Sequence, residues 1–246
     1  KIIEQASLED DPEAREALQV EVAALKAADH PYVVRLYEVM RCPAGTYLVL
    51  ELLTGGDLFD RIERHGPLCE LDAAHLACQV GGALAHIHHL RLVHRDIKPS
   101  NVWLVDSPDG RLHSKLLDFG ICKAMPSGLQ LEELTRPGSI LGTPNYMAPE
   151  QCRGRSTDER SDLYGLGVLL WSTLMGYPPV QGRTNLEAMT LHVTQDTPKP
   201  SALGVEVAPA LEAVIMRSMA KAPEARFSSA KYMHRALSAA KEASFT

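Results

Sequence analysis

Three short runs, each with at least one carboxylate, could together carry out chemistry. They are His94-Arg95-Asp96-Ile97-Lys98-Pro99-Ser100-Asn101, then Asp118-Phe119-Gly120, then Ala148-Pro149-Glu150. A carboxylate such as Asp96 or Asp118 can accept a proton or bind a hard metal ion. Any one triplet could arise by chance. All three, in this order and with these gaps, indicate a catalytic site.

The three runs together resemble the signature set of Ser/Thr protein kinases of the eukaryotic (Hanks) type, and the resemblance extends from Lys1 to about Ser238. It implies transfer of the ATP γ-phosphate to a Ser or Thr hydroxyl of a protein substrate, with Mg²⁺ as cofactor. Asp96 matches the residue that accepts the hydroxyl proton. Lys98 matches the lysine that contacts the transferred phosphate and is typical of Ser/Thr-specific kinases. Asn101 and Asp118 match the Mg²⁺ ligands.

The resemblance also implies residues that bind the ATP phosphates. Glu21 aligns with a helix glutamate whose ion-pair partner, a strand lysine, would be Lys1, and the pair would organise the α- and β-phosphates. The alternative is that both are ordinary surface charges. The sequence starts at Lys1 and so does not include the glycine-rich GxGxxG loop that comes before this lysine in the family. We expect the parent protein to carry that loop upstream, and this segment by itself to be weakly active at best.

The adenine side of the site is recognisable too. Leu50 falls beside the back of the purine pocket, and backbone groups of Glu51 and Leu53 are expected to face the base. Asp57 matches a residue that often reaches the ribose or a basic substrate side chain. Trp103 departs from the family pattern, which usually has Leu or Ile on the pocket floor, so it either narrows the pocket or stacks on the base.

Regulation can be read from the segment between the second and third runs. Ser139 occupies the usual activating phosphosite, where a phosphate added by an upstream kinase or by trans-autophosphorylation could pair with Arg95. The alternative is an unmodified loop serine. Ile121 is β-branched, which in this family accompanies a preference for Thr acceptors. Ser100 stands where kinases selecting basic substrates often carry Glu, which weakens any claim that this chain selects basic substrates.

Two further matches concern residues that hold the C-terminal lobe and the catalytic loop in place. Glu150 and Arg226 align with a buried ion pair that braces the C-terminal lobe. Asp162 aligns with a helix carboxylate that holds the backbone of the catalytic loop.

The elements that would position these residues follow from the apolar pattern. A small α+β part leads through the glycine-containing hinge near residues 54–57 into a larger, mainly helical part, so we expect a bilobal kinase fold of class α+β. Residues 1–53 would form a partial N-lobe and residues 54–246 the C-lobe. The pattern predicts helices at 13–28, from 58, and at 71–90, strands at 36–39, 47–52, 102–105 and 115–117, and mostly helix after 161.

The composition excludes several other classes. Of the 246 residues 45% are hydrophobic and 23% charged, as in ordinary globular proteins. The net charge of −6 gives no reason to expect a nucleic-acid partner. The longest apolar stretch, residues 163–175, is shorter than the roughly 20 residues of a membrane span. Five scattered cysteines without a CxxC pair argue against a zinc site and fit reduced thiols in the cytoplasm.

Two other functions stay open. A pseudokinase or scaffold would bind partners without turnover; the intact catalytic residues argue against it, and the missing glycine-rich loop supports it. A small-molecule phosphotransferase of the aminoglycoside-kinase type would share the catalytic Asp, but Lys98 and the Ala148-Pro149-Glu150 segment count against it. Within the kinases, residues 51–62 resemble calcium/calmodulin-dependent enzymes, whereas residues 158–164 and 223–227 resemble bacterial Ser/Thr kinases.

Overall fold

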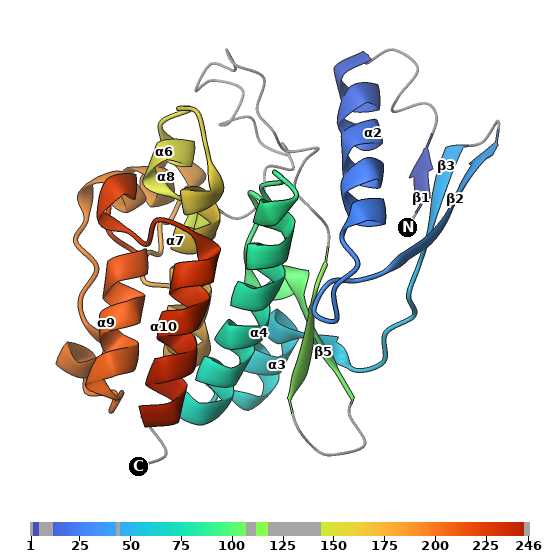
Figure 1. The fold of residues 1–246 in the computed structure, drawn as a ribbon. Helices are drawn as coiled ribbons and strands as arrows, with labels where there is room; N and C mark the ends of the chain where they lie inside the picture. The colour runs from blue at the N-terminus through green and yellow to red at the C-terminus, as the bar shows by residue number, and fades with distance from the viewer. Residues whose placement is uncertain (1, 5–11, 43–44, 107–111, 118–143, 244–246) are drawn as a thin grey trace.

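The computed structural model describes residues 2–4, 12–42, 45–106, 112–117 and 144–243. It has a small part built on a sheet and one helix, and a larger part built mostly of helices, with strand β5 (Val102–Val105) between them (Figure 1). The predicted bilobal α+β kinase fold is confirmed.

The small part is an antiparallel sheet with helix α2 (Pro12–Ala27) beside it. The strands are β1 (Ile2–Glu4), β2 (Leu36–Cys42) and β3 (Gly45–Leu50), in the order β1-β3-β2. Strands β2 and β3 pair antiparallel as a hairpin, with Leu36 opposite Leu50. Buried Leu25 and Leu48 belong to the hydrophobic core that continues into the larger part.

The larger part is organised around two long helices, α4 (Glu70–His89) and α7 (Glu159–Met175). Helix α7 is buried on all sides, because each of its residues from Ser161 to Leu174 is shielded from solvent. The other helices pack around this pair: α3 (Leu58–His65), α6 (Pro149–Cys152), α8 (Asn185–Thr194), α9 (Pro209–Ser218) and α10 (Ala230–Ala243).

Short 3₁₀ helices connect these elements, and each begins with proline: η1 (Pro99–Asn101), η3 (Pro144–Tyr146), η4 (Pro200–Leu203) and η5 (Pro223–Ala225). Proline suits this first position because the missing N–H would have no partner within the helix. Helix η1 ends at Asn101, so Asn101 lies directly before β5.

A second small sheet supports the catalytic loop. It consists of β4 (Gly56–Asp57), β5 and β6 (His113–Leu116), in that order. Strand β4 was not predicted, since two residues carry no periodicity. Gly55 makes it possible: its φ of 99° is unfavourable for a side chain, and a Cβ there would collide with the Leu104 carbonyl.

The predicted helices and strands are otherwise confirmed, with ends shifted by a few residues. Within the described ranges no helix combines the length and apolar character needed to span a membrane.

The described cysteines fall into two groups. Cys42 and Cys69 are exposed, whereas Cys78 and Cys152 are buried free thiols. Cys78 lies on α4 in the main core, and Cys152 lies on α6 in a separate small cluster with Met189, Met147 and Val193. Burial raises the pKa of the Cys152 thiol to about 12, so this side chain stays protonated.

Candidate active site

The catalytic loop follows α4 and brings three of the predicted residues together. Asp96 Oδ2 lies 3.0 Å from Lys98 Nζ. The Asn101 amide donates from Nδ2 to the same carboxylate oxygen at 2.8 Å and to the Asp96 carbonyl oxygen at 2.7 Å. Asp96 and Lys98 are each partly exposed, so the cluster can meet a substrate. Their carboxylate, ammonium and amide groups therefore converge on one place.

Asp162 holds this loop from behind. It is buried near the start of α7, and its carboxylate accepts hydrogen bonds from the backbone N–H groups of His94 (2.8 Å) and Arg95 (2.7 Å) and from His88 Nε2 (2.8 Å). Arg95 has a φ of 65°, a costly conformation for a side chain of this size. The predicted role of Asp162 is confirmed.

His94 connects the loop to the strand that leads to Asp118. The Asp96 N–H donates to His94 Nδ1 at 3.3 Å, so the proton of the neutral ring lies on Nε2, which donates to the Leu117 carbonyl at 2.8 Å. The Leu117 N–H in turn donates to the Asn101 carbonyl at 2.8 Å. Asp118 itself lies outside the described residues, but its neighbour Leu117 is bound to the same loop as Asp96.

The donor set near Asn101 fits a magnesium ion. Both Nδ2 hydrogens of Asn101 point at Asp96, which leaves Oδ1 as the side-chain atom for a cation. Mg²⁺ prefers oxygen ligands and keeps several waters, so one amide oxygen and one carboxylate, predicted to be that of Asp118, are sufficient protein ligands. Asn101 is buried, and the hydrogen bonds to Asp96 fix its orientation.

On the adenine side, the segment after β3 offers backbone groups. The Glu51 N–H donates to the Arg35 carbonyl at 2.8 Å. Within the described part of the chain, the Glu51 carbonyl and the Leu53 N–H have no backbone partner, as a hinge facing a base requires. Leu50 is partly buried against the core.

Trp103 and Asp57 are tied to the second sheet, where they lie opposite each other on β5 and β4. The Trp103 indole N–H donates to the Thr54 carbonyl at 3.0 Å, which fixes the ring against the hinge segment. Asp57 Oδ1 accepts from the Asp60 N–H at 2.8 Å and so caps α3. This capping role was not predicted.

An ion pair behind the hinge was not predicted from the sequence. The Glu51 carboxylate accepts from Lys115 Nζ at 2.7 Å and, more weakly, from the Arg35 N–H at 3.3 Å. Lys115 lies on β6 between buried Ser114 and Leu116. Alternation along this strand indicates that Lys115 faces away from the core, but nothing in the sequence identifies its partner 64 residues away.

The second predicted brace is confirmed. Arg226 makes two hydrogen bonds to the Glu150 carboxylate, at 2.7 and 2.8 Å, and Ser161 Oγ donates to it at 2.7 Å. Burial would raise the pKa of Glu150, but these hydrogen bonds outweigh it and hold the pKa below its usual value. Next to it, Gln151 donates to the Arg95 carbonyl at 3.0 Å, so this brace also contacts the catalytic loop.

Five predicted residues cannot be placed as side chains. Glu21 is described only as part of the backbone of α2, and the other four lie outside the described residues: Lys1, Asp118, Ile121 and Ser139. Strand β1 starts directly after Lys1 and pairs with β3, Ile2 opposite Tyr47.

Comparison with known proteins decides the family. The protein kinase domain matches residues 1–238. The chain belongs to the protein kinase domain family. It is 38% identical over 170 residues to calcium-dependent protein kinase 5 of Plasmodium berghei, covering 69% of this chain and 29% of that protein. It is 37% identical over 184 residues to myosin light chain kinase A of Dictyostelium discoideum, which is 75% of this chain and 59% of that protein.

A bacterial relative covers more of the chain. Serine/threonine-protein kinase PknE of Mycobacterium bovis is 36% identical over 221 residues, which is 90% of this chain and 38% of that protein. The predicted mixed similarity is therefore confirmed. The chain spans less than two thirds of the length of each of these three relatives.

Proposed function

We propose that this chain transfers the γ-phosphate of ATP to Ser or Thr hydroxyls of protein substrates. The observation that carries the proposal is the convergence of Asp96, Lys98 and Asn101, with Asp96 Oδ2 within 3.0 Å of the other two side chains. Phosphoryl transfer needs an acceptor oxygen held in line with the phosphate and positive charge around the phosphate, and this cluster supplies both.

Asp96 is the base. The acceptor hydroxyl binds at its carboxylate and gives up its proton to it as the bond to phosphorus forms, while ADP leaves. Lys98, already beside Asp96, places its ammonium group against the transferred phosphate and stabilises the spread negative charge. Asn101 Oδ1 and the Asp118 carboxylate would hold Mg²⁺, which neutralises phosphate charge when bound.

The nucleotide base binds between the two lobes, residues 1–53 and 54–246. The Glu51 carbonyl and the Leu53 N–H bind the adenine edge, Leu50 lies at the back of the pocket, and the Trp103 ring stacks on the base. The bond from Trp103 to Thr54 supports this assignment because it keeps the ring at the hinge. Asp57 binds the ribose through the carboxylate oxygen that does not cap α3.

The α- and β-phosphates are organised by Lys1 and Glu21. Strand β1 and helix α2 support this pairing, since the first follows Lys1 and the second carries Glu21.

Activity is regulated at Ser139, by an upstream kinase or by trans-autophosphorylation. Arg95 supports this, because its Nε is buried and has no hydrogen-bond partner among the described residues. Thr acceptors are preferred, and the enzyme works in the cytoplasm without nucleic acid.

A transfer assay tests the proposal. The protein as its gene encodes it is incubated with γ-labelled ATP, Mg²⁺ and a generic protein acceptor, with Asp96→Asn as the control. We expect transfer to fall by about 10²- to 10⁴-fold in the variant, the usual contribution of a general base, with ATP binding retained. Bound ATP without transfer in the unsubstituted protein would instead favour a scaffold.

A further inference from the structure

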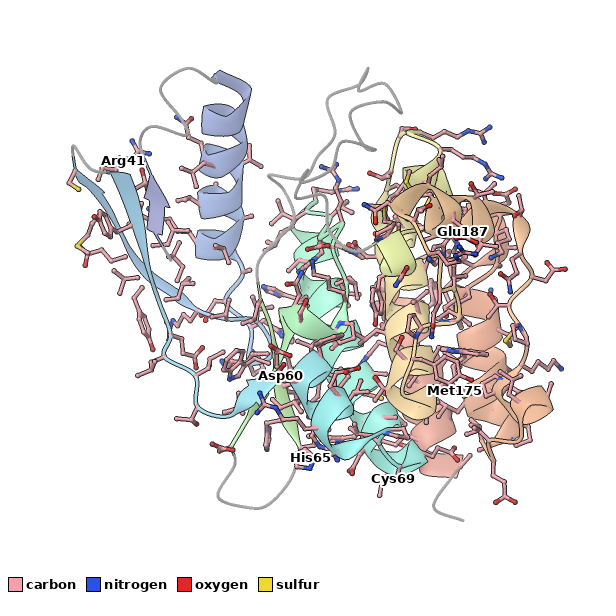
Figure 2. The ribbon with its side chains drawn as sticks, turned by 180° about the vertical axis from the view of Figure 1, so that it is seen from behind. Arg41, Asp60, His65, Cys69, Met175 and Glu187 are labelled. Atoms are coloured by element: carbon pink, nitrogen blue, oxygen red, sulfur yellow. The ribbon has the colours of Figure 1, made fainter. Side chains whose placement is uncertain are left out.

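Three histidines from distant parts of the chain lie together where the small part meets the larger one. His30 belongs to the loop between α2 and β2, His86 to the C-terminal half of α4, and His234 to α10. Gly82 on α4 lies between two of the rings, since a Cβ built there would be 3.8 Å from the ring of His30 and 3.7 Å from that of His234. Figure 2 labels Cys69 directly before α4, and His86 lies about 25 Å farther along that helix.

The loop that carries His30 runs from the end of α2 to the larger part and back to β2 (Figure 1). Its backbone is fixed to β6, because the Leu116 N–H donates to the Tyr32 carbonyl at 2.8 Å and the Val34 N–H donates to the Leu116 carbonyl at 3.0 Å. Its side chains rest on α4, where the His30 ring stacks on the His86 ring with centroids 5.1 Å apart. The position of α2 on the larger part therefore depends on this loop.

The hydrogen bonds of these rings suit their neutral forms. His30 Nδ1 accepts from the Tyr32 N–H at 3.3 Å, so the proton of the neutral ring is on Nε2. His86 Nε2 is buried and has no hydrogen-bond partner in the part of the chain that the structure describes. His234 Nδ1 donates to the Cys78 carbonyl at 2.9 Å. A second proton on His30 would therefore break the bond from Tyr32, and a charged His86 would bury an N–H without an acceptor.

The charges around His30 also oppose its protonation. Burial lowers the pKa of His30, and His86, His234 and Lys115 lower it further. These three side chains come from α4, α10 and β6, and each is positive or becomes so when protonated. The ammonium group of Lys115 is paired with the Glu51 carboxylate at 2.7 Å, so that carboxylate already has a partner.

The carboxylate on the same loop is exposed to solvent. Asp29 lies 4.0 Å from Arg35, and these side chains are 80% and 63% exposed, so water screens the charge of Asp29 from His30. His30 thus takes up a proton more readily when the loop leaves α4. The packed loop is fully stable above about pH 6.5, the ordinary histidine value, and loses stability as the pH falls below it.

We propose that His30, His86 and His234 form a pH switch that holds the loop between α2 and β2 on α4 near neutral pH and releases it in mildly acidic solution. Release of the loop frees α2. Because α2 carries Glu21, which is proposed to organise the ATP phosphates, acid should weaken the use of ATP. Only this last step rests on the proposed kinase function.

Rates of phosphate transfer between pH 7.5 and pH 5.5 test the switch in the protein as its gene encodes it. His30→Asn combined with His86→Phe keeps an acceptor for the Tyr32 N–H and a ring against it, but neither new side chain takes up a proton. We expect kcat/KM for ATP to fall about three- to tenfold less in this double variant than in the unsubstituted protein, the range expected when a histidine titrates near pH 6. Titration of ATP and of Asp96 is common to both proteins. His65→Gln, on the side of the molecule away from α2 in Figure 2, should follow the unsubstituted protein.

Hydrogen exchange separates this inference from the kinase function. The amides of Val34 and Leu116 should lose protection between pH 7.5 and pH 5.5, after correction for the intrinsic rate, while those of α7 stay protected. This result supports the switch even without phosphate transfer, in which case the kinase function alone is overturned. Unchanged protection of Val34 and Leu116, or an equal acid loss of activity in the double variant, overturns the switch while transfer at neutral pH continues.

Discussion

At the scale of single residues, the proposed catalytic base, Asp96, depends on the buried carboxylate of Asp162. Asp162 fixes the backbone of His94 and Arg95, and His94 in turn accepts from the Asp96 N–H. A fixed geometry of this kind lowers the reorganisation needed during transfer. Asp162 is therefore a positioning residue.

We expect Asp162→Asn to lower kcat at least about tenfold, with little change in the KM for ATP, because the amide cannot satisfy three buried donors at once. The free energy of unfolding should fall by about 2–3 kcal/mol. Steady-state kinetics and urea denaturation measure the two effects. Asp158→Asn, at the exposed N-cap of the same helix, is the control and should cost about 1 kcal/mol or less without changing kcat. An unchanged kcat in Asp162→Asn would contradict the positioning role.

A second residue-scale prediction concerns the buried brace. Arg226→Lys keeps the charge but loses the two parallel hydrogen bonds to Glu150, so we expect the free energy of unfolding to drop by about 3 kcal/mol. Chemical denaturation at neutral pH measures it. The exposed Arg155→Lys should change stability by less than about 0.5 kcal/mol. Equal stability of the two variants would mean that the brace contributes nothing specific.

At the scale of elements, the pair Glu51–Lys115 joins the segment proposed to bind adenine to the strand that leads to Asp118. Both side chains are largely shielded, with 24% and 19% exposed. The pair therefore fixes the separation between the segment after β3 and strand β6, the two sides of the proposed ATP site.

We expect Lys115→Met to raise the KM for ATP about fivefold, equivalent to about 1 kcal/mol for a partly screened pair, with a smaller effect on kcat. Glu51→Gln should do the same. The exchanged pair Glu51→Lys with Lys115→Glu should recover part of the loss. Initial rates at varied ATP concentration measure these effects, and additive losses in a double-mutant cycle would show that the two residues act separately.

How far the sequence predicts the molecule depends on the range of each interaction. Asp96, Lys98 and Asn101 lie within one octapeptide, and α4 and α7 carry long apolar patterns, so this cluster and these helices were predictable. Strand β4 is too short for any pattern. The Glu51–Lys115 pair joins elements that only the tertiary fold brings together, and no local signal marks it.

At the scale of the whole molecule, a buried histidine makes stability depend on pH. Burial lowers the pKa of His192 to about 4, and Tyr164 Oη lies 2.8 Å from its Nδ1. The unfolded chain takes up a proton as the pH falls through about 6.5, but the folded chain does so only near 4. Stability is thus fully present above pH 6.5 and decreases as the pH falls toward 4.

We expect His192 to account for about 3 kcal/mol of lost stability between pH 7 and pH 4. His192→Gln should flatten this dependence, although the variant starts from lower stability at pH 7. Urea denaturation at several pH values measures the slope. His65→Gln, at an exposed position on α3, should keep the original slope. Equal slopes in the unsubstituted protein and His192→Gln would refute the assignment.

The two buried thiols can report how the molecule opens. Cys78 lies in the main core and Cys152 in the small cluster of α6 and α8, so an alkylating reagent reaches them only through different opening events. If the α6–α8 region opens by itself, Cys152 will be labelled faster than Cys78 under native conditions. If the larger part unfolds as one unit, mass spectrometry will find both thiols modified together. Labelling order would then map cooperativity within the kinase domain without any substitution.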